Sequence, residues 1–299
     1  MKYGVFVIFF FIFFLGCNQP KEESRVDFSD VELFEVIRSG DKRFDLSGIV
    51  HFNSSIIAVA DKPWNKFLYK INPDTTLNKA TTEEIFSLTY EFKSDFEAVD
   101  YADSVFYIAD ERSSEIYTYD LRKAEMRVLN LGWPQNIVRG NWGNAGLEAI
   151  AVDKDNGRLF IGKERDEAAL FVSSISGGVT EPINMEDFPE GFDVSDMKYE
   201  NHHLYLLNRG NYRVIKWDTS TGKIIDYFDY SFVMNANGEK LYSSSRYPMA
   251  EGLSLTSDHI WLALDNNGDS FNNDNPWIEM SKFAGENPLL VRFNRPEGF

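Results

Sequence analysis

Short apolar runs recur along the chain from residue 31 onward, at a spacing close to 50 residues. Five similar segments open these repeats, and their second residues stand at positions 47, 97, 148, 195 and 251. The intervals between those positions are 50, 51, 47 and 56 residues. Self-similarity at a fixed period of this length is typical of repeat architectures, so the repeat is the first guide to the fold. The five segments are residues 46–49, 96–99, 147–150, 194–197 and 250–253.

Each opening segment is followed by further runs with the composition of β-strands. A second, strongly apolar strand is predicted at 56–61, 105–110, 159–164, 204–209 and 260–265. A third is predicted at 67–72, 115–120, 169–174, 213–218 and 289–294, and a weaker fourth at 85–90, 126–131, 179–184 and 225–230.

Four strands per repeat at this period predict an all-β fold, a single β-propeller of four-stranded blades over residues 31–299. Counting favours five blades, and six remains possible because residues 231–249 have room for another hairpin. The last repeat lacks a fourth strand, whereas residues 32–37 form an unpaired strand before the first repeat. We expect this N-terminal strand to complete the last blade and close the ring, which removes a free sheet edge.

The first 30 residues have a different character. Residues 1–16 join a charged start to a Phe- and Ile-rich apolar run, which predicts a secretory signal peptide. Residues 14–17 resemble the bacterial lipobox, so Cys17 is expected to carry lipid, followed by a polar tether to residue 30. These features predict an outer-membrane lipoprotein in the cell envelope of a Gram-negative bacterium, at the periplasmic face or the cell surface. The alternative is an uncleaved N-terminal anchor with an incidental cysteine.

Composition narrows the range of partners. The 299 residues include 30 basic and 47 acidic side chains, for a formal net charge of −17. Such an acid excess argues against nucleic-acid binding, which needs clustered Lys and Arg. The single cysteine excludes an intrachain disulfide and a cysteine-based zinc cluster. We expect a monomer that contacts the membrane through lipidated Cys17.

Carboxylates recur at the openings of the repeats, in strands that line the central channel of a propeller. Two carboxylates about 6 Å apart repel by roughly 3 kcal/mol at an effective dielectric near 20. A converging group must therefore be protonated, solvated or bound to a cation, and Ca²⁺ is the natural candidate for oxygen ligands. Alternatively, each carboxylate accepts hydrogen bonds from backbone amides of the neighbouring blade. The predicted calcium ligands are Glu97, Glu148, Asp196 and Glu251.

A second set of polar residues stands where the second strands end, and these residues are expected to face one rim. Arg165 and Arg209 are candidates for holding an anion beside a metal, and Glu164 is a further catalytic candidate. Solvated turns or ion pairs between blades explain the same pattern equally well. The other rim candidates for ligand binding are Asp61, Asp110, Glu111, Asp265 and Asn266.

The sequence offers few signs of other catalytic or binding sites. The sequence lacks a Gly-rich phosphate loop, a Gly-x-Ser-x-Gly elbow and a His-Glu-x-x-His motif. The four histidines, His51, His202, His203 and His259, stand in or near turns between first and second strands, and we expect them to be surface residues.

Several of these segments together resemble the phytase-like family known for esterase-like activity. The resemblance rests on residues 146–152 with 159–164, on 194–197 with 204–209, and on 250–253 with 265–267. The sequence departs from the family pattern at Ala98, Ala149, Asn208 and Asn266. The chain is also similar to the SdiA-regulated propeller lipoproteins, for which no firm enzymatic role is implied.

Two functions follow from these patterns. The phytase-like resemblance implies a calcium-dependent hydrolase of an ester or phosphoester, with the four predicted ligands around the metal and Arg165 or Arg209 on the anion. The alternative is a noncatalytic binding module of the cell envelope that recognises a glycan, a peptide or a protein partner. Propellers serve both uses, so the fold does not decide between them.

Overall fold

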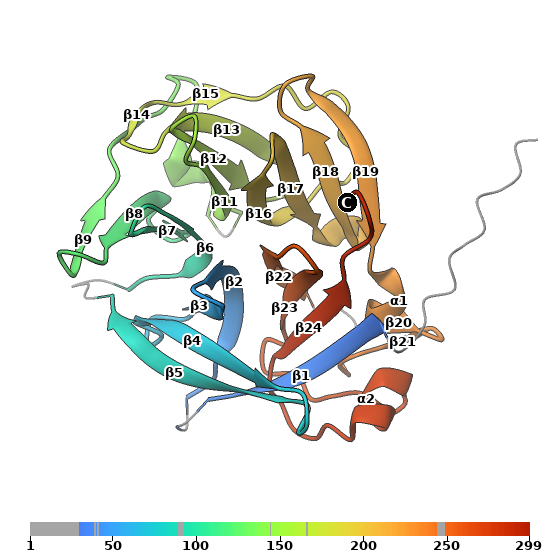
Figure 1. Cartoon of the computed structure of the whole chain (residues 1–299). Coiled ribbons are helices and arrows are strands. Elements are labelled where there is room, and N and C mark those ends of the chain that lie inside the picture. The colour runs from blue at the N-terminus through green and yellow to red at the C-terminus, as the bar shows by residue number, and fades with distance from the viewer. Residues whose placement is uncertain are drawn as a thin grey trace, which may run out of the picture.

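The structure is a computed structural model that describes residues 30–38, 40, 42–88, 93–143, 145–165, 167–243 and 249–299 (Figure 1). The predicted signal peptide, Cys17 and the tether up to residue 29 lie outside the described residues. The described chain is all-β, as predicted, and its two α-helices are short: α1 (Ser231–Met234) and α2 (Pro276–Ser281). Among the described residues, no helix has the length and apolar character needed to cross a bilayer.

Three four-stranded sheets follow one another along the middle of the chain, with antiparallel neighbours throughout. The first contains β6 (Phe96–Ala102), β7 (Val105–Asp110), β8 (Glu115–Asp120) and β9 (Glu125–Val128). The second contains β11 (Leu147–Asp153), β12 (Arg158–Lys163), β13 (Ala169–Ser174) and β15 (Glu181–Pro182). The third contains β16 (Val194–Glu200), β17 (His203–Asn208), β18 (Arg213–Asp218) and β19 (Lys223–Asp229).

The two ends of the chain share an eight-stranded sheet, in the order β2-β3-β4-β5-β1-β24-β23-β22. Strand β1 (Val31–Ile37) pairs antiparallel with β24 (Leu289–Asn294), and at three positions it also pairs parallel with β5 (Lys79–Ser87). The N-terminal strand therefore lies outside the third strand of the last repeat. The other members are β2 (Asp45–Phe52), β3 (Ser55–Asp61), β4 (Phe67–Asp74), β22 (Met249–Leu255) and β23 (His259–Asp265).

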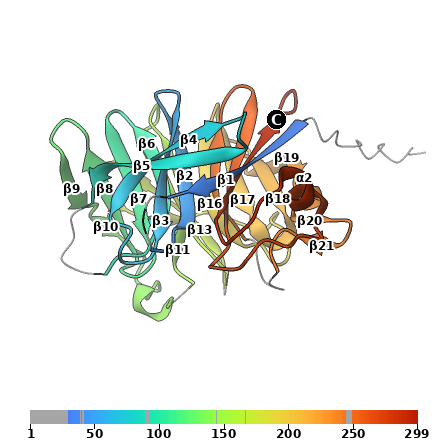
Figure 2. The ribbon, with the colours of Figure 1, turned by 90° about the horizontal axis from the view of Figure 1, so that it is seen from below.

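The sheets are arranged around a common axis, with β2, β6, β11, β16 and β22 innermost (Figure 1). These five strands contact one another in that order, and β22 returns to contact β2. Close approach at this ring explains Gly48, because a Cβ there would stand 2.6 Å from the Ala98 Cα. Figure 2 shows the ring edge-on, with α2 and the short strands β20 (Asn235–Ala236) and β21 (Glu239–Lys240) together on one side.

The innermost and outermost strands differ in burial, and this difference explains where the sequence pattern misplaced strand boundaries. Every residue of β11 is buried, whereas β19 has no buried residue. An outer strand has few apolar positions to mark its limits. The prediction of a strand over 85–90 was wrong in its position, because β5 begins at Lys79 and ends at Ser87. The predicted strand 126–131 divides into β9 and β10 (Leu131–Gly132), which pairs with β14 (Gly178–Val179).

Residues 231–243 belong to the segment 231–249, which is long enough to hold a hairpin of a sixth blade. They form α1 and the hairpin β20–β21, whose two-residue strands pair only with each other within the described chain. This segment is therefore an insertion beside the ring, and its described part is not a four-stranded unit.

Candidate functional site

A β-bulge interrupts every innermost strand at the same place and determines which side chains enter the channel. The register shifts lie between residues 46 and 49, 96 and 98, 147 and 149, 194 and 196, and 250 and 252. The extra residue of a bulge stays outside the ladder and re-aims its side chain. The residues at these bulges include Glu97, Glu148 and Glu251, with Ser47 and Ser195 at the corresponding places.

Three of the four predicted calcium ligands meet in one cavity at this end of the channel. Glu97, Glu148 and Glu251 line a space of about 300 Å³, and seven acidic side chains surround it against three basic ones. The acidic residues are Asp61, Asp95, Glu97, Glu111, Glu148, Glu251 and Asp265, and the basic residues are Lys62, Arg165 and Arg209. We call this space the mouth site.

Glu97 and Glu148 are the two carboxylates of the mouth site that the protein leaves least compensated. They are only 9% and 6% exposed, and neither forms a hydrogen bond or ion pair with any described residue. Burial raises the pKa of Glu97 well above its ordinary value, and the charge of Glu148 raises it further. Burial also raises the pKa of Glu148 well above normal, although Arg209 opposes that shift. Both groups therefore require a proton or a cation.

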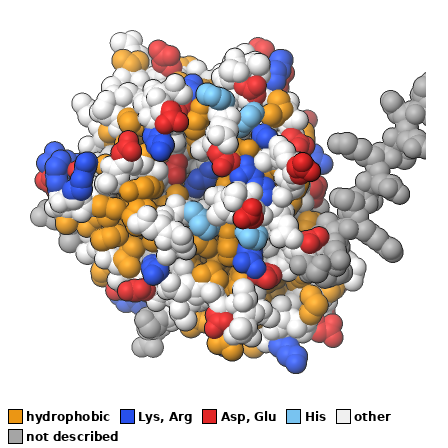
Figure 3. Space-filling view, in the orientation of Figure 1, with side chains coloured by type: hydrophobic (Ala, Val, Ile, Leu, Met, Phe, Trp, Pro, Cys, Tyr) orange, Lys and Arg blue, Asp and Glu red, His pale blue; other side chains and the backbone are white. Residues whose placement is uncertain are grey.

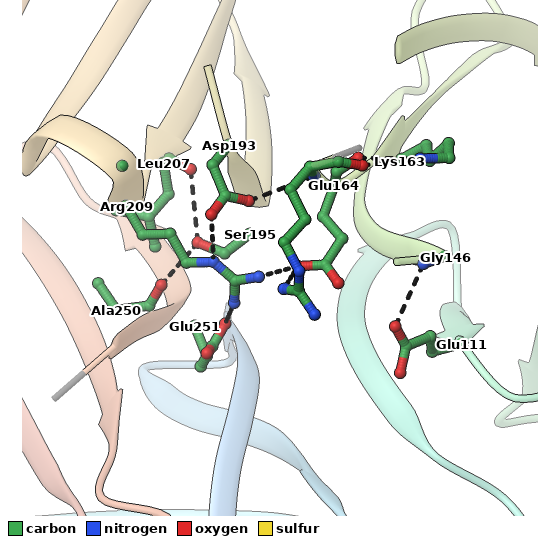
Figure 4. A network of polar contacts seen from close by, with 12 residues as sticks. Glu111, Gly146, Lys163, Glu164, Asp193, Ser195, Leu207, Arg209, Ala250 and Glu251 are labelled. Carbon is green, nitrogen blue, oxygen red and sulfur yellow. Dashed lines mark hydrogen bonds and ion pairs between the residues drawn. The ribbon is translucent and has the colours of Figure 1, made fainter. Parts of the chain in front are cut away.

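Arg209 neutralises another part of the acidic group. It stands at the start of the 3₁₀-helix η3 (Arg209–Asn211), and its guanidinium forms ion pairs with Glu164, Asp193 and Glu251 (Figure 4). The Arg209 Nε to Asp193 Oδ2 distance is 3.1 Å. Burial alone would lower the pKa of Arg209, but Glu251 and Glu148 outweigh burial and raise it. A permanent cation thus joins the ends of three neighbouring sheets.

Two groups of three carboxylates have the spacing that a metal ion requires. One oxygen from each of Glu111, Glu148 and Glu164 lies within 4.8 Å of the others, and the same holds for Asp61, Asp95 and Glu97. Glu164 Oε1 is buried without a hydrogen-bond partner. An all-oxygen donor set with an orphaned buried oxygen fits a hard cation such as Ca²⁺ better than a soft metal.

Asp196, the fourth predicted calcium ligand, lies outside the mouth site, so its prediction as a ligand beside the three glutamates was wrong. Its Oδ1 accepts from Lys198 Nζ at 2.8 Å, and its Oδ2 accepts from the Leu253 backbone amide at 2.7 Å. The reason is the bulge, at which Ser195 takes the place that the glutamates have in other blades and Asp196 turns toward the next blade. Burial raises the pKa of Asp196 to about 7 despite Lys198. Asp100 has a similar role, accepting from Val152 N at 2.7 Å.

The rim candidates separate into two groups. Asp61, Glu111, Arg165 and Asp265 line the mouth site. Asp110 instead accepts from the Asp95 amide at 2.8 Å and from Ser113 Oγ at 2.9 Å. Asn266 donates from Nδ2 to the carbonyl oxygens of Asp269 and Glu286, both at 2.8 Å. These last two residues therefore hold loops in place.

Sequence reasoning did not identify Asp95 and Asp193 as members of the site. Asp95 lines the mouth site and Asp193 binds Arg209, and each residue immediately precedes an innermost strand. The repeat contained a usable signal, because aspartate stands directly before the opening segment in three of the five repeats, at 45, 95 and 193.

The opposite end of the innermost strands carries histidines. Their side chains gather near the middle of the face that Figure 3 shows. His51 lines a cavity of about 550 Å³ there with Asp100 and Lys198. It is half-buried rather than fully exposed, and its Nδ1 lies 2.8 Å from Ser254 Oγ. Burial, and then the charge of His259, lower the pKa of His51 to about 4, so it is a weak base at neutral pH.

The mouth site predicts how stability depends on pH. Burial, and then the charge of Asp45, raise the pKa of Asp265 from 3.8 to about 8. The folded state therefore holds a proton that the unfolded chain has lost, so stability falls as pH rises from about 4 to about 8. In chelator, we expect Asp265→Asn to reduce this slope by up to about 1.4 kcal/mol per pH unit.

Urea unfolding at several values between pH 5 and pH 8 measures the effect. Asp218→Asn is the control, because hydrogen bonds from Ser220 hold the pKa of Asp218 at about 2, below the tested range. Equal slopes for the wild type and Asp265→Asn would contradict the assignment of a protonated Asp265 in the folded state.

Comparisons with known proteins agree with the ring of sheets. The model of the SdiA-regulated family matches residues 53–263. Among solved structures, the glutaminyl cyclase of Myxococcus xanthus is 9% identical, with 88% of this chain and 100% of that chain covered and a TM-score of 0.53. The luciferin-regenerating enzyme is 10% identical, with 87% and 80% covered and a TM-score of 0.50. At such low identity these likenesses concern the fold alone.

The search of curated proteins finds no relative of this chain. The phytase-like resemblance is not confirmed by these comparisons, whereas the second resemblance noted in the sequence is supported by a match over more than half of the chain. Together with the all-β ring, this match identifies the chain as a member of the SdiA-regulated family.

Proposed function

We propose that this protein binds Ca²⁺ in the mouth site and uses it to hydrolyse a small ester or phosphoester. The observation that carries the proposal is the pair Glu97 and Glu148, which are buried close together without a hydrogen bond or ion pair to any described residue. Nearby carboxylates in such a setting repel by several kcal/mol unless a proton or cation intervenes.

The cation would be held by Glu148 with Glu111 and Glu164, and Glu97 would contribute from the adjacent group with Asp61 and Asp95. A divalent metal in such a place polarises a carbonyl or phosphoryl oxygen and makes bound water more acidic. Glu251 lines the same cavity and is held by Arg209, so it is the candidate general base; burial raises its pKa, and Arg209 opposes that rise.

The two arginines have different roles in this proposal. Arg165 forms an ion pair with Glu164, and its side chain is 40% exposed at the mouth, so its guanidinium can also reach the oxygen of an incoming ester. Arg209 is 5% exposed and its guanidinium already binds three carboxylates. Arg209 therefore acts as a positioning residue that fixes Glu164 and Glu251.

We also propose that the domain over residues 31–299 is a closed five-bladed propeller. The return of contact from β22 to β2 supports closure, and the pairing of β1 with β24 supports completion of the last blade by the N-terminal strand. An experimental structure with a sixth four-stranded sheet would contradict this.

Calcium binding predicts a measurable gain in stability. Free Ca²⁺ at 100 times its dissociation constant is expected to stabilise the fold by about 2.7 kcal/mol, and chelator to remove that gain. Glu148→Gln and Glu97→Gln keep the side-chain shape and delete the charge, so both should lose most of the calcium-dependent part. Glu125→Gln, in the exposed end of β9, is the matched control.

Turnover on a panel of carboxylic and phosphate esters separates the two functions. We expect calcium-dependent hydrolysis in the wild type and a loss of about 100-fold or more in Glu148→Gln. Calcium-dependent stability without turnover on any ester would favour the alternative, a noncatalytic binding module for a glycan, peptide or protein partner. A free energy of unfolding and an ester turnover that are both independent of calcium would contradict the proposal.

We further propose that the protein is a monomeric lipoprotein of the outer membrane, anchored through Cys17. Cys17 is the only thiol and follows an apolar signal segment directly. Labelled palmitate should be incorporated into the wild type, and Cys17→Ser should abolish the label. Equal labelling of both proteins would refute the anchor.

A further inference from the structure

A recess with both apolar and polar lining residues adjoins the mouth site at Arg165. It has a volume of about 500 Å³, within the range of roughly 300 to 1,000 Å³ typical of small-molecule pockets. The segment between β15 and β16 provides most of its wall. Its apolar lining residues are Ala168, Met185, Phe188, Pro189 and Phe192.

The wall of this recess is held in a fixed shape. Phe188 and Phe192 pack edge to face with ring centroids 4.8 Å apart. The Phe188 amide donates to the Met185 carbonyl at 3.0 Å, and the Phe192 amide donates to the Pro189 carbonyl at 3.2 Å. An ion pair of 2.8 Å between Lys223 and Asp187 joins the same segment to β19. The recess is therefore preorganised to receive an apolar group.

The recess and the mouth site adjoin each other at one shared residue. Arg165 lines both spaces. Asp193 lines the recess, and its carboxylate accepts from Arg209 Nε at the edge of the mouth site. A single small molecule can therefore place one part in the recess and a polar centre beside Glu148 and Glu251.

The side chains at the mouth favour an uncharged ester. Basic side chains are in the minority there, three against seven acidic ones, so the mouth offers few partners to a substrate that carries several negative charges, such as a polyphosphate. An uncharged carboxylic ester needs no such partners. Its apolar acyl chain also matches the aromatic wall of the recess.

On the basis of the proposed hydrolysis, we propose that the substrate is a neutral carboxylic ester whose apolar acyl chain binds in this recess. Burial of two methylene groups is worth about tenfold in affinity. The geometry therefore assigns chain-length selectivity to Phe188 and Phe192, outside the cation site.

The kinetic test compares p-nitrophenyl octanoate with p-nitrophenyl acetate in the presence of Ca²⁺. We expect kcat/KM to be at least tenfold higher for octanoate in the wild type, and this ratio to fall about tenfold in Phe188→Ala, mainly through KM. Phe188→Leu should recover most of the ratio. Tyr227→Ala, an exposed aromatic on β19, should leave the ratio unchanged.

A binding test keeps this inference separate from the proposed function. Calorimetry with octanoate and acetate, in Ca²⁺, should give at least tenfold tighter binding of octanoate to the wild type and loss of that preference in Phe188→Ala. If no ester is hydrolysed but this preference is observed, the proposed hydrolysis is refuted, whereas the assignment of the recess as an acyl-chain site is supported. Equal binding of octanoate and acetate, or an unchanged preference in Phe188→Ala, overturns the recess.

Discussion

The ion-pair group around Arg209 is the interaction on which the mouth of the channel depends. Its guanidinium binds Glu164 after β12, Asp193 before β16 and Glu251 within β22, so one cation joins three sheets that share no backbone pairing at this point. Removing one partner of a buried ion pair typically costs about 3–5 kcal/mol, because the remaining charge stays uncompensated. Arg209 neutralises only some of the carboxylates of the mouth site. Glu97 and Glu148 still require a proton or a cation.

Buried carboxylates inside and outside the mouth site are compensated in opposite ways. Outside the mouth site, Asp100 and Asp196 accept backbone amides of the next innermost strand, and Lys198 lies against Asp196. Those carboxylates hold neighbouring blades together. At the mouth, the β-bulges turn Glu97, Glu148 and Glu251 out of the ladder, where few backbone amides can reach them. The same chemical group, a carboxylate, is therefore structural outside the mouth site and available for a ligand within it.

The repeat pattern predicted the innermost and second strands well, because these strands are buried on both faces and their apolar runs have sharp limits. The exposed outer strands, such as β5, gave a weak signal and were misplaced. Glu97, Glu148 and Glu251 were predicted to converge because they share one position in the repeat. Asp196 was assigned wrongly because a shift of one residue at a β-bulge reverses the direction in which a side chain points. The amino-acid composition of the segment does not reveal the bulge. Pairwise contacts such as those between Arg209 and Asp193 depend on the ring and are not visible in the sequence.

The most direct test of the account is a calorimetric titration of Ca²⁺ into the full protein at pH 7, in two buffers of different ionisation enthalpy. Carboxyl groups with raised pKa values must release protons when a cation binds. The account predicts a saturable calcium site whose apparent binding enthalpy differs between the buffers, with both signals lost in Glu148→Gln. An absence of binding, or binding without proton release that is unchanged in Glu148→Gln, would contradict a cation site formed by these buried carboxylates.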